Sequence, residues 1–409
     1  MDQNVMTNMQ HTNVRARECH QLFKTSVYEV HKNRNPDRVK GTCQWVINDP
    51  LYQSWLDSTN DNLLLITADP GCGKSVLSKS LIDGELKSQG SRSTCYFFFK
   101  DNDEQNGLSD ALCSLLHQFF THSPKLLSYA SPFFDRHGYS LQKDTAQLWQ
   151  ILLQATTDPE AGDVVCILDA LDECALDEQA CLIDFLTSFY NSSMMTTSRH
   201  STLKFLVTSR PYKNIERGFY RIRDGLEIIR LPGEEENKQI STEIDAVIDA
   251  WIFDLSIELE LGPSLQEALQ SRLHEIRHRS YLWLYLVFRE LRESSKQTVR
   301  KFTSIIHEIP KSVEEAYERI LNKSTDQETA KILLKIIVGA ARPLRWKELD
   351  IALAVATQKE ISSIEDLDLD REKLKSRIRN LCGLFVYIDD SRVHLFHQTA
   401  KEFLLRRDV

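Results

Sequence analysis

The stretch Ala68-Asp-Pro-Gly-Cys-Gly-Lys-Ser75 has the residue types and spacing of a phosphate-binding loop, with alanine in the first glycine position. Gly71 and Gly73 let the backbone curl so that successive N–H groups point at a phosphate. The Lys74 ammonium can reach the β- and γ-phosphates, and the Ser75 hydroxyl can ligate Mg²⁺. The pattern therefore predicts nucleotide binding. The predicted contacts are Asp69, Pro70, Gly71, Cys72, Gly73, Lys74, Ser75 and Val76.

Carboxylates that could serve Mg²⁺ and a water molecule follow the apolar run at 164–168. Asp169 ends this run, so it is predicted to lie at the end of a strand and to hold the metal, directly or through water. Asp172 and Glu173 stand further along, where either can polarise an attacking water. The sequence does not choose between these two, because one of them can instead orient its neighbour or cap the next helix.

A candidate cation follows another apolar run, in Leu-Lys-Phe-Leu-Val-Thr-Ser-Arg-Pro at 203–211. If this strand neighbours the strand of Asp169, its tip faces the γ-phosphate, and Arg210 can sense whether that phosphate is present. The alternative is an exposed arginine before a proline. Pro211 ends the strand in either case.

These residues need strands that end at one edge of a sheet. Buried-strand candidates alternate with helical patterns, which favours a parallel five-stranded α/β sheet. They lie at 62–67, 93–100, 163–169, 203–209 and 226–231. The sheet is assigned to the branch of P-loop NTPases that inserts a strand between the phosphate-loop strand and the carboxylate strand. Strand 93–100 is interpreted as that inserted strand, before the Walker B strand.

The pattern changes after Pro232, where the strand signals stop and helix-forming sequence continues to about residue 340. Two helices, two short strands around the turn at 389–391 and a closing helix then suggest a winged helix. The predicted organisation is an N-terminal helix and linker at 1–40, a P-loop NTPase domain at 41–233, an all-α helical domain at 234–322 and a winged-helix domain at 323–409.

Composition narrows the possible partners and the location. Acidic residues number 59 against 50 basic ones, so general nucleic-acid binding is disfavoured. The polar N-terminus lacks the apolar core of a signal peptide, and the longest apolar runs fall short of the roughly 18 residues of a membrane span. We therefore expect a soluble, cytoplasmic protein. The 9 cysteines have no paired CxxC spacing and are interpreted as reduced core residues.

With these motifs the chain resembles the NACHT module of fungal NOD-like receptors, in the STAND class of signal-transducing NTPases. The resemblance runs in order from about residue 19 to 405. It rests on LLLITADPGCGKSVLSK, CILDALDEC, FLVTSRP, YLWLYLVFREL, IPKSVEEAYERIL, ARPLRWKELDIALAVA and VHLFHQTAKEFLL. The family pattern places the phosphate loop on Gly71, Gly73, Lys74 and Ser75, the acidic cluster on Asp169, Asp172 and Glu173, and the sensor on Arg210.

The resemblance implies a nucleotide-operated switch. In this family ADP (or GDP) locks the NTPase domain against the helical and winged-helix domains. Exchange for ATP or GTP opens the molecule, which then self-associates and brings effector domains together, in fungal innate immunity, heterokaryon incompatibility and programmed cell death. His397 corresponds to the winged-helix histidine that touches the β-phosphate in the closed state. Its alternative is a buried or helix-capping histidine.

The chain departs from the family pattern at three places. Ala68 replaces the first glycine, which sets the turn and does not closely approach a phosphate. RSYLWLYL, 279–286, stands where animal and plant relatives have a Gly-x-Pro stretch that packs on the base, and 237–240 lacks the aspartate of an Asn-Lys-x-Asp guanine motif, so base preference is not readable. No repeats follow the winged helix, which is expected of a fragment of a longer receptor or of a short natural form.

Two other function classes compete with the switch. A turnover P-loop ATPase, such as an AAA-like motor or a kinase, uses the same loop, but the segment after Asp169 offers no arginine-rich lid for a second substrate. A binding scaffold with a vestigial site is the other, and the intact Lys74, Ser75, Asp169 and Glu173 argue against it. The effector, the ligand-sensing partner and the oligomeric state cannot be inferred from these residues.

Overall fold

The computed structural model describes residues 14–406 except 61, 103–104, 194–200, 223–225, 232–237, 277–278, 294–298, 325, 358–370, 384 and 390. The chain divides into two compact units, Met1–Gly233 and Glu234–Val409. The predicted domain boundary near 233 and the predicted turn residue Asp390 lie outside the described residues.

A five-stranded sheet forms the centre of the first unit, and its strands match the predicted ones closely. The strands are β1 (Asn62–Ala68), β2 (Arg92–Phe98), β3 (Asp163–Asp169), β4 (Thr202–Ser209) and β5 (Glu227–Leu231). Every neighbouring pair is parallel, which confirms the parallel α/β fold. The edge strand β5 is only partly buried and alternates between the core and the surface.

The strand order is β2-β3-β4-β1-β5, and it corrects one prediction. The strand at 93–100 precedes the Asp169 strand along the chain, but it lies at the edge of the sheet beside β3. The strand between the phosphate-loop strand and the Asp169 strand is β4. The chain crosses from β1 to the far edge and then fills the intervening places with β3 and β4. Local sequence patterns specify strands but not their neighbours, so this order could not be read from them.

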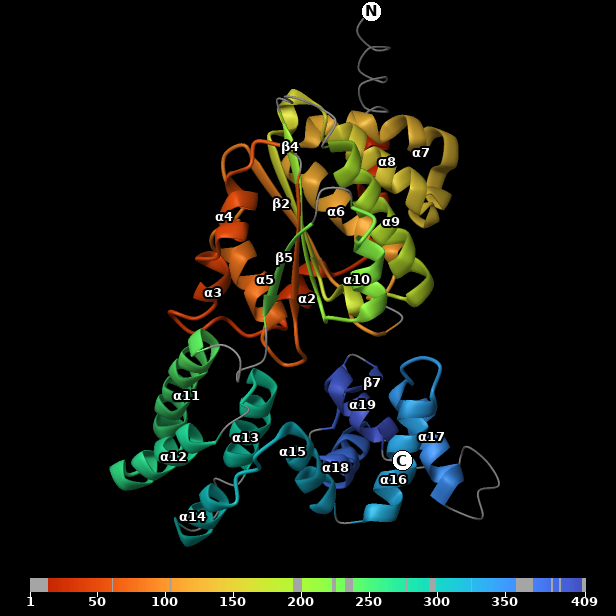
Figure 1. Cartoon of the computed structure of the whole chain (residues 1–409). Helices are drawn as coiled ribbons and strands as arrows, with labels where there is room; N and C mark the ends of the chain where they lie inside the picture. The colour runs from red at the N-terminus through yellow and green to blue at the C-terminus, as the bar shows by residue number, and fades with distance from the viewer. Residues whose placement is uncertain are drawn as a thin grey trace, which may run out of the picture. The chain divides into compact units, whose positions relative to one another are not determined.

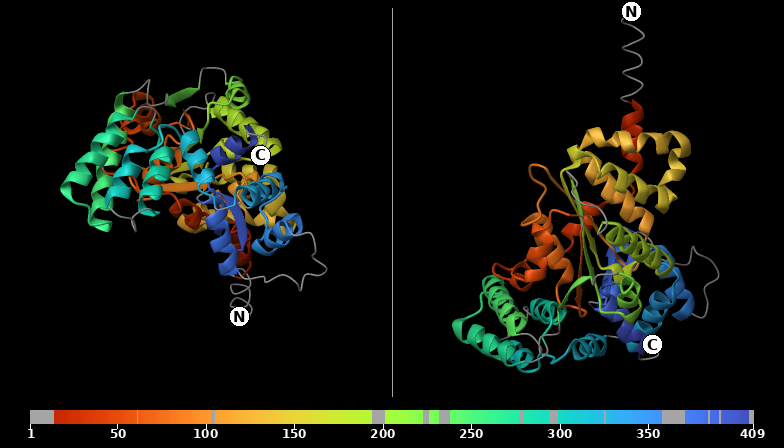
Figure 2. Two further views of the ribbon diagram at one scale, coloured as in Figure 1. Left: turned by 90° about the horizontal axis from the view of Figure 1, so that it is seen from below. Right: turned by 45° about the horizontal axis from the view of Figure 1, so that its top comes forward.

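Helices cover both faces of the sheet, as parallel strands require (Figure 1). Side chains alternate along β1, so Leu64 and Ile66 pack with α3, α4 and α5, while Leu63 and Leu65 pack with α6, α8, α9 and α10. The right-hand view of Figure 2 shows the same two helix layers. The helices are α2 (Tyr28–Asn33), α3 (Gln44–Ile47), α4 (Pro50–Asp57), α5 (Lys74–Asp83), α6 (Leu108–His122), α7 (Ser131–His137), α8 (Thr145–Ala155), α9 (Leu176–Ser193) and α10 (Lys213–Phe219).

The N-terminal segment is part of this packing. Residues 14–22 are helical. Cys19, Leu22 and Phe23 are buried in the same core as α6 and α8. The described N-terminal segment therefore packs as an element of the NTPase fold, where the sequence suggested a helix and a linker.

The second unit contains helices and one small hairpin. Its helices are α11 (Lys238–Glu258), α12 (Pro263–Glu275), α13 (Tyr281–Glu293), α14 (Val299–His307), α15 (Val313–Asn322), α16 (Gln327–Gly339), α17 (Trp346–Thr357), α18 (Arg371–Cys382) and α19 (Gln398–Arg406). The antiparallel strands β6 (Val386–Asp389) and β7 (Arg392–Leu395) precede α19, as the winged-helix prediction requires. Leu282 and Leu286 of α13 are buried in the same core as the winged-helix segments. No helix in the described part of the chain is long and apolar enough to cross a membrane.

Candidate nucleotide-binding site

The phosphate loop connects the end of β1 to the start of α5. Gly71 and Gly73 have φ angles of 77° and 81°, in the left-handed region that costs other residues about 1–2 kcal/mol. Gly73 is the N-cap of α5, so the free N–H groups of the first helical turn open onto the loop. Asp69 and Pro70 are exposed, and residues 71–76 are half-buried. This backbone can accept an anion.

Lys74 folds back over its own loop. Its ammonium donates hydrogen bonds to the carbonyl oxygens of Ala68, at 2.8 Å, and Asp69, at 3.1 Å. Burial lowers the pKa of Lys74, while the charges of Asp172 and Asp169 act against that shift. The cation is therefore held at the mouth of the loop, where phosphate oxygens would replace the two carbonyl groups.

Asp169 lies at the end of β3, only 1% exposed, and three hydroxyl groups donate to its carboxylate. Ser75 donates to one oxygen at 2.5 Å. Ser78 and Thr208 donate to the other, at 2.6 Å and 2.7 Å. Burial raises the pKa of Asp169, and these hydrogen bonds oppose the rise. The phosphate loop, the first turns of α5 and the end of β4 thus meet on one carboxylate.

Arg210 is buried in an ion pair with Asp172. The Arg210 Nε lies 3.0 Å from one carboxylate oxygen, and the Arg210 backbone N–H donates to the other at 3.0 Å. The two side chains are only 4% and 3% exposed. Arg210 also donates to the Tyr212 hydroxyl at 3.1 Å. The alternative of an exposed arginine is wrong, because β4 lies next to β3 and brings Arg210 against the acidic turn.

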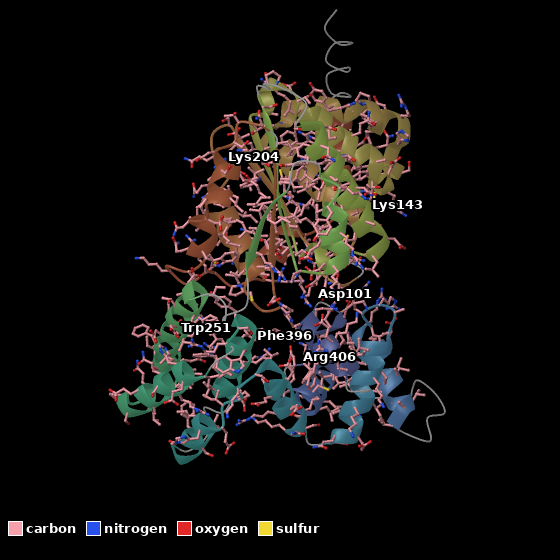
Figure 3. The ribbon with its side chains drawn as sticks, in the orientation of Figure 1. Asp101, Lys143, Lys204, Trp251, Phe396 and Arg406 are labelled. Atoms are coloured by element: carbon pink, nitrogen blue, oxygen red, sulfur yellow. The ribbon has the colours of Figure 1, made fainter. Side chains whose placement is uncertain are left out.

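Glu173 has a different environment from its neighbour. The backbone N–H of Asp101, which follows β2, donates to its carboxylate at 3.2 Å. Burial and the charge of Asp172 raise the pKa of Glu173 to about 7. Figure 3 labels Asp101 at this end of the sheet and Lys204, near the start of β4, at the other. With a pKa near 7, Glu173 can accept a proton near neutral pH, whereas both oxygens of Asp172 are engaged by Arg210.

The buried Arg210–Asp172 ion pair leads to a prediction about protein stability. Asp172→Asn leaves the Arg210 guanidinium buried without its counter-charge, so the free energy of unfolding of the first unit should fall by about 3 kcal/mol. Urea denaturation followed by tryptophan fluorescence measures this change.

Asp184→Asn is the matched control. It breaks an ion pair with Arg221 whose side chains are 60% and 70% exposed, and should change little. Equal, small losses in the two variants would contradict a structural role for the Asp172 pair. Adding Arg210→Met to Asp172→Asn should recover most of the lost stability.

Three hydroxyl groups donate to Asp169, and the sequence alone did not reveal all of them. It did not single out Ser78, and it gave no role to Thr208. Ser78 is fully buried on α5 one turn after Ser75, and Thr208 is fully buried on β4. Residues three positions apart on a helix lie on the same face, so the sequence does indicate that Ser75 and Ser78 share a face. Nothing in the local sequence indicates that this face meets β3.

His397 lies in the second unit, directly before α19. The Thr399 backbone N–H donates to its Nδ1 at 3.1 Å, and the Thr399 hydroxyl lies 2.8 Å from the same atom. The structure therefore gives His397 a helix-capping geometry. Since Nδ1 accepts, the neutral ring carries its proton on Nε2. A contact with phosphate stays a prediction.

The donor set suits Mg²⁺. The Ser75 hydroxyl and the Asp169 carboxylate are adjacent hard oxygen donors, and Mg²⁺ in such sites takes its remaining ligands from water and phosphate. Among the described residues, no group of three or more His, Cys, Asp or Glu side chains could hold a metal by itself.

The class of protein follows from this geometry. A parallel sheet in the order β5-β1-β4-β3-β2, a Gly-rich loop between β1 and α5, and carboxylates after β3 define a P-loop NTPase fold, followed here by a winged helix.

Comparisons with known families agree in chain order. Residues 41–210 match the Nephrocystin 3 N-terminal family, residues 240–309 match a domain of unknown function (DUF7069), and residues 317–409 match the winged helix domain of GPI inositol-deacylase. The chain is 28% identical over 375 residues to the vegetative incompatibility protein HET-E-1 of Podospora anserina. These matches confirm the resemblance to NACHT-type STAND NTPases of fungal NOD-like receptors.

The match covers 90% of this chain and 26% of HET-E-1, so the chain spans about a quarter of that relative's length. Among solved structures, the Walker-type ATPase PABY2304 of Pyrococcus abyssi is 15% identical, with coverage of 87% and 93% of the two chains and a TM-score of 0.38. The Aeropyrum pernix ORC2 protein is 13% identical, with coverage of 91% and 94% and a TM-score of 0.38. Because these scores are low, the class rests on the sheet order, the site and the sequence matches.

Proposed function

We propose that this chain is a nucleotide-dependent signalling switch that binds NTP and NDP with Mg²⁺ and hydrolyses NTP slowly. The nucleotide is ATP/ADP or GTP/GDP. Its state controls the opening and self-association of the protein in fungal incompatibility or innate immunity, in the cytoplasm. The resemblance to HET-E-1, a vegetative incompatibility protein by name, supports this biological setting.

The observation that carries the proposal is the buried Arg210–Asp172 ion pair at the carboxyl end of β4. The guanidinium contacts Asp172 through Nε and the Tyr212 hydroxyl through one Nη, so a γ-phosphate that draws it away from Asp172 must compete with these contacts. Breaking a buried pair without compensation costs about 3–5 kcal/mol, so the triphosphate must supply an equivalent interaction. An arginine held in this way suits a protein that reads the phosphate and reacts slowly, more than a rapid enzyme.

The residues have separate tasks in the proposed reaction. The loop N–H groups and Lys74 bind the β- and γ-phosphates, and Ser75 and Asp169 hold Mg²⁺, which neutralises phosphate charge. Glu173 accepts a proton from the attacking water. Asp172 keeps Arg210 at the edge of the site, where the guanidinium can meet the charge of the transferred phosphoryl group. His397 is proposed to contact the β-phosphate in the closed state.

The nucleotide that accompanies the purified protein tests the proposal. The protein is denatured, and the released nucleotide is identified by ion-exchange chromatography. We expect a diphosphate, ADP or GDP, in near-stoichiometric amount, together with slow turnover. An empty site with fast multiple turnover would instead support the alternative, a turnover P-loop ATPase of the AAA-like or kinase type.

A further inference from the structure

We propose that Ser78 and Thr208 are positioning residues that orient Asp169 for Mg²⁺ and set the site's requirement for the metal. The inference rests on the proposed function, because it assigns partners to the carboxylate that would hold Mg²⁺. Neither side chain is expected to touch the nucleotide.

Ser78 and Thr208 hold a carboxylate that water does not reach. Both donate to the same oxygen of Asp169, at 2.6 Å and 2.7 Å, and both are fully buried. Ser75 donates to the other oxygen and is half-buried at the mouth of the loop. One Asp169 oxygen is therefore held by two interior hydroxyls, and the other faces the residue that would share the metal.

Thr208 also fixes the turn that follows Asp169. Ala170 has a φ angle of 60°, in the left-handed region that is unfavourable for alanine. Its buried backbone N–H donates to the Thr208 hydroxyl oxygen at 2.9 Å. The same hydroxyl thus donates to the Asp169 carboxylate and accepts from the next residue. This turn leads to Asp172 and Glu173, so the Thr208 side chain holds both Asp169 and the start of the acidic turn.

Residues that hydrogen-bond to a metal ligand usually strengthen metal binding. Replacing a residue that orients a metal ligand typically costs about 10–100-fold in metal affinity. Removing either hydroxyl takes away one of the three donors that hold the buried Asp169 carboxylate, so the carboxylate is held less firmly and can turn away from the metal position. The phosphate-binding N–H groups and Lys74 do not depend on these hydroxyls, so binding without metal should persist.

The chain offers matched controls. Ser80 on α5 and Thr67 at the end of β1 are buried, at 9% and 1% exposure. Within the described structure, neither hydroxyl has a hydrogen-bond partner. Ser80→Ala is therefore the control for Ser78→Ala, and Thr67→Val is the control for Thr208→Val. Thr208→Ser keeps the hydroxyl and removes only a methyl group.

The experiment measures nucleotide affinity, with no need for turnover. Nucleotide-free variants of the 409-residue chain are titrated with mant-ADP and mant-GDP in EDTA, and then with mant-ATP and mant-GTP at increasing Mg²⁺. We expect Ser78→Ala and Thr208→Val to keep the wild-type affinity for the mant-diphosphate in EDTA. The Mg²⁺ concentration that half-saturates the tightening of triphosphate binding should rise at least about tenfold. Thr208→Ser and both controls should behave as the wild type.

Unchanged Mg²⁺ dependence in Ser78→Ala and Thr208→Val, with binding in EDTA intact, would overturn the positioning role. The same holds if the two controls shift as much as the test variants. If Thr208→Val does not fold, as loss of binding in EDTA would reveal, Ser78→Ala and Thr208→Ser decide the question. A wild-type protein that binds none of the four nucleotides would instead remove the proposed function itself.

Discussion

Replacing Lys74 by alanine is expected to abolish measurable nucleotide binding. The ammonium lies over the phosphate loop, hydrogen-bonded to the Ala68 and Asp69 carbonyl oxygens. A phosphate would exchange these neutral acceptors for charged ones, and the charge-assisted hydrogen bonds contribute about 3 kcal/mol or more, which is at least about 100-fold in Kd. Isothermal titration calorimetry with ADP, ATP, GDP and GTP measures the loss.

Lys87→Ala is the control for this variant, because Lys87 is exposed beyond the end of α5 and has the same charge. It should bind as the wild type does. Circular dichroism melting should show both variants folded. Normal affinity in folded Lys74→Ala would mean that the loop between β1 and α5 is not the nucleotide site.

Replacing Glu173 by glutamine is expected to slow NTP hydrolysis by about 100-fold or more while nucleotide binding is kept, because a general base contributes about 10²–10⁴-fold. Glutamine preserves the acceptor oxygen for the Asp101 N–H, so the local fold should survive. Single-turnover hydrolysis, followed by chromatography of the nucleotide, separates this step from release. Asp177→Asn is the control, since Asp177 is exposed in the first turn of α9.

The pH dependence gives the same variant a second readout. The pKa of Glu173 is raised to about 7, and a base acts in its ionised form. The hydrolysis rate should therefore rise with pH up to about 7, with a change of about tenfold per pH unit below that value, and level off above it. Glu173→Gln should lose this dependence. A variant that hydrolyses at the wild-type rate with the same pH profile would assign the base elsewhere, with Asp172 the next candidate.

Much of the fold could be predicted from local patterns. The apolar runs at 62–67 and 163–169 became β1 and β3 because residues buried on both sheet faces must be apolar throughout. The loop residues Gly71 and Gly73 could be assigned because only glycine enters the left-handed region at low cost. The hairpin and the final helix of the winged helix could also be predicted locally, from the alternation of apolar and polar residues and from the turn residues between the strands.

Other features depended on contacts between distant segments. The strand at 93–100 was assigned to the wrong place in the sheet because strand order depends on how the crossovers pack, which no local pattern records. The different environments of Asp172 and Glu173 depend on the position of Arg210, 38 residues from Asp172. The backbone N–H that contacts Glu173 comes from Asp101, 72 residues away.

The sequence by itself determined that this protein has a phosphate loop on a parallel sheet and carboxylates at a strand end. These features depend on which residues stand at neighbouring positions, namely glycine, lysine and acidic residues at fixed spacings. Only the tertiary structure decided the partners of those groups. It placed β4 between β1 and β3, so that Ser75, Ser78 and Thr208 meet on Asp169 while Arg210 pairs with Asp172. The physical reason is that hydrogen bonds and ion pairs require atoms within about 3–4 Å, a condition set by packing.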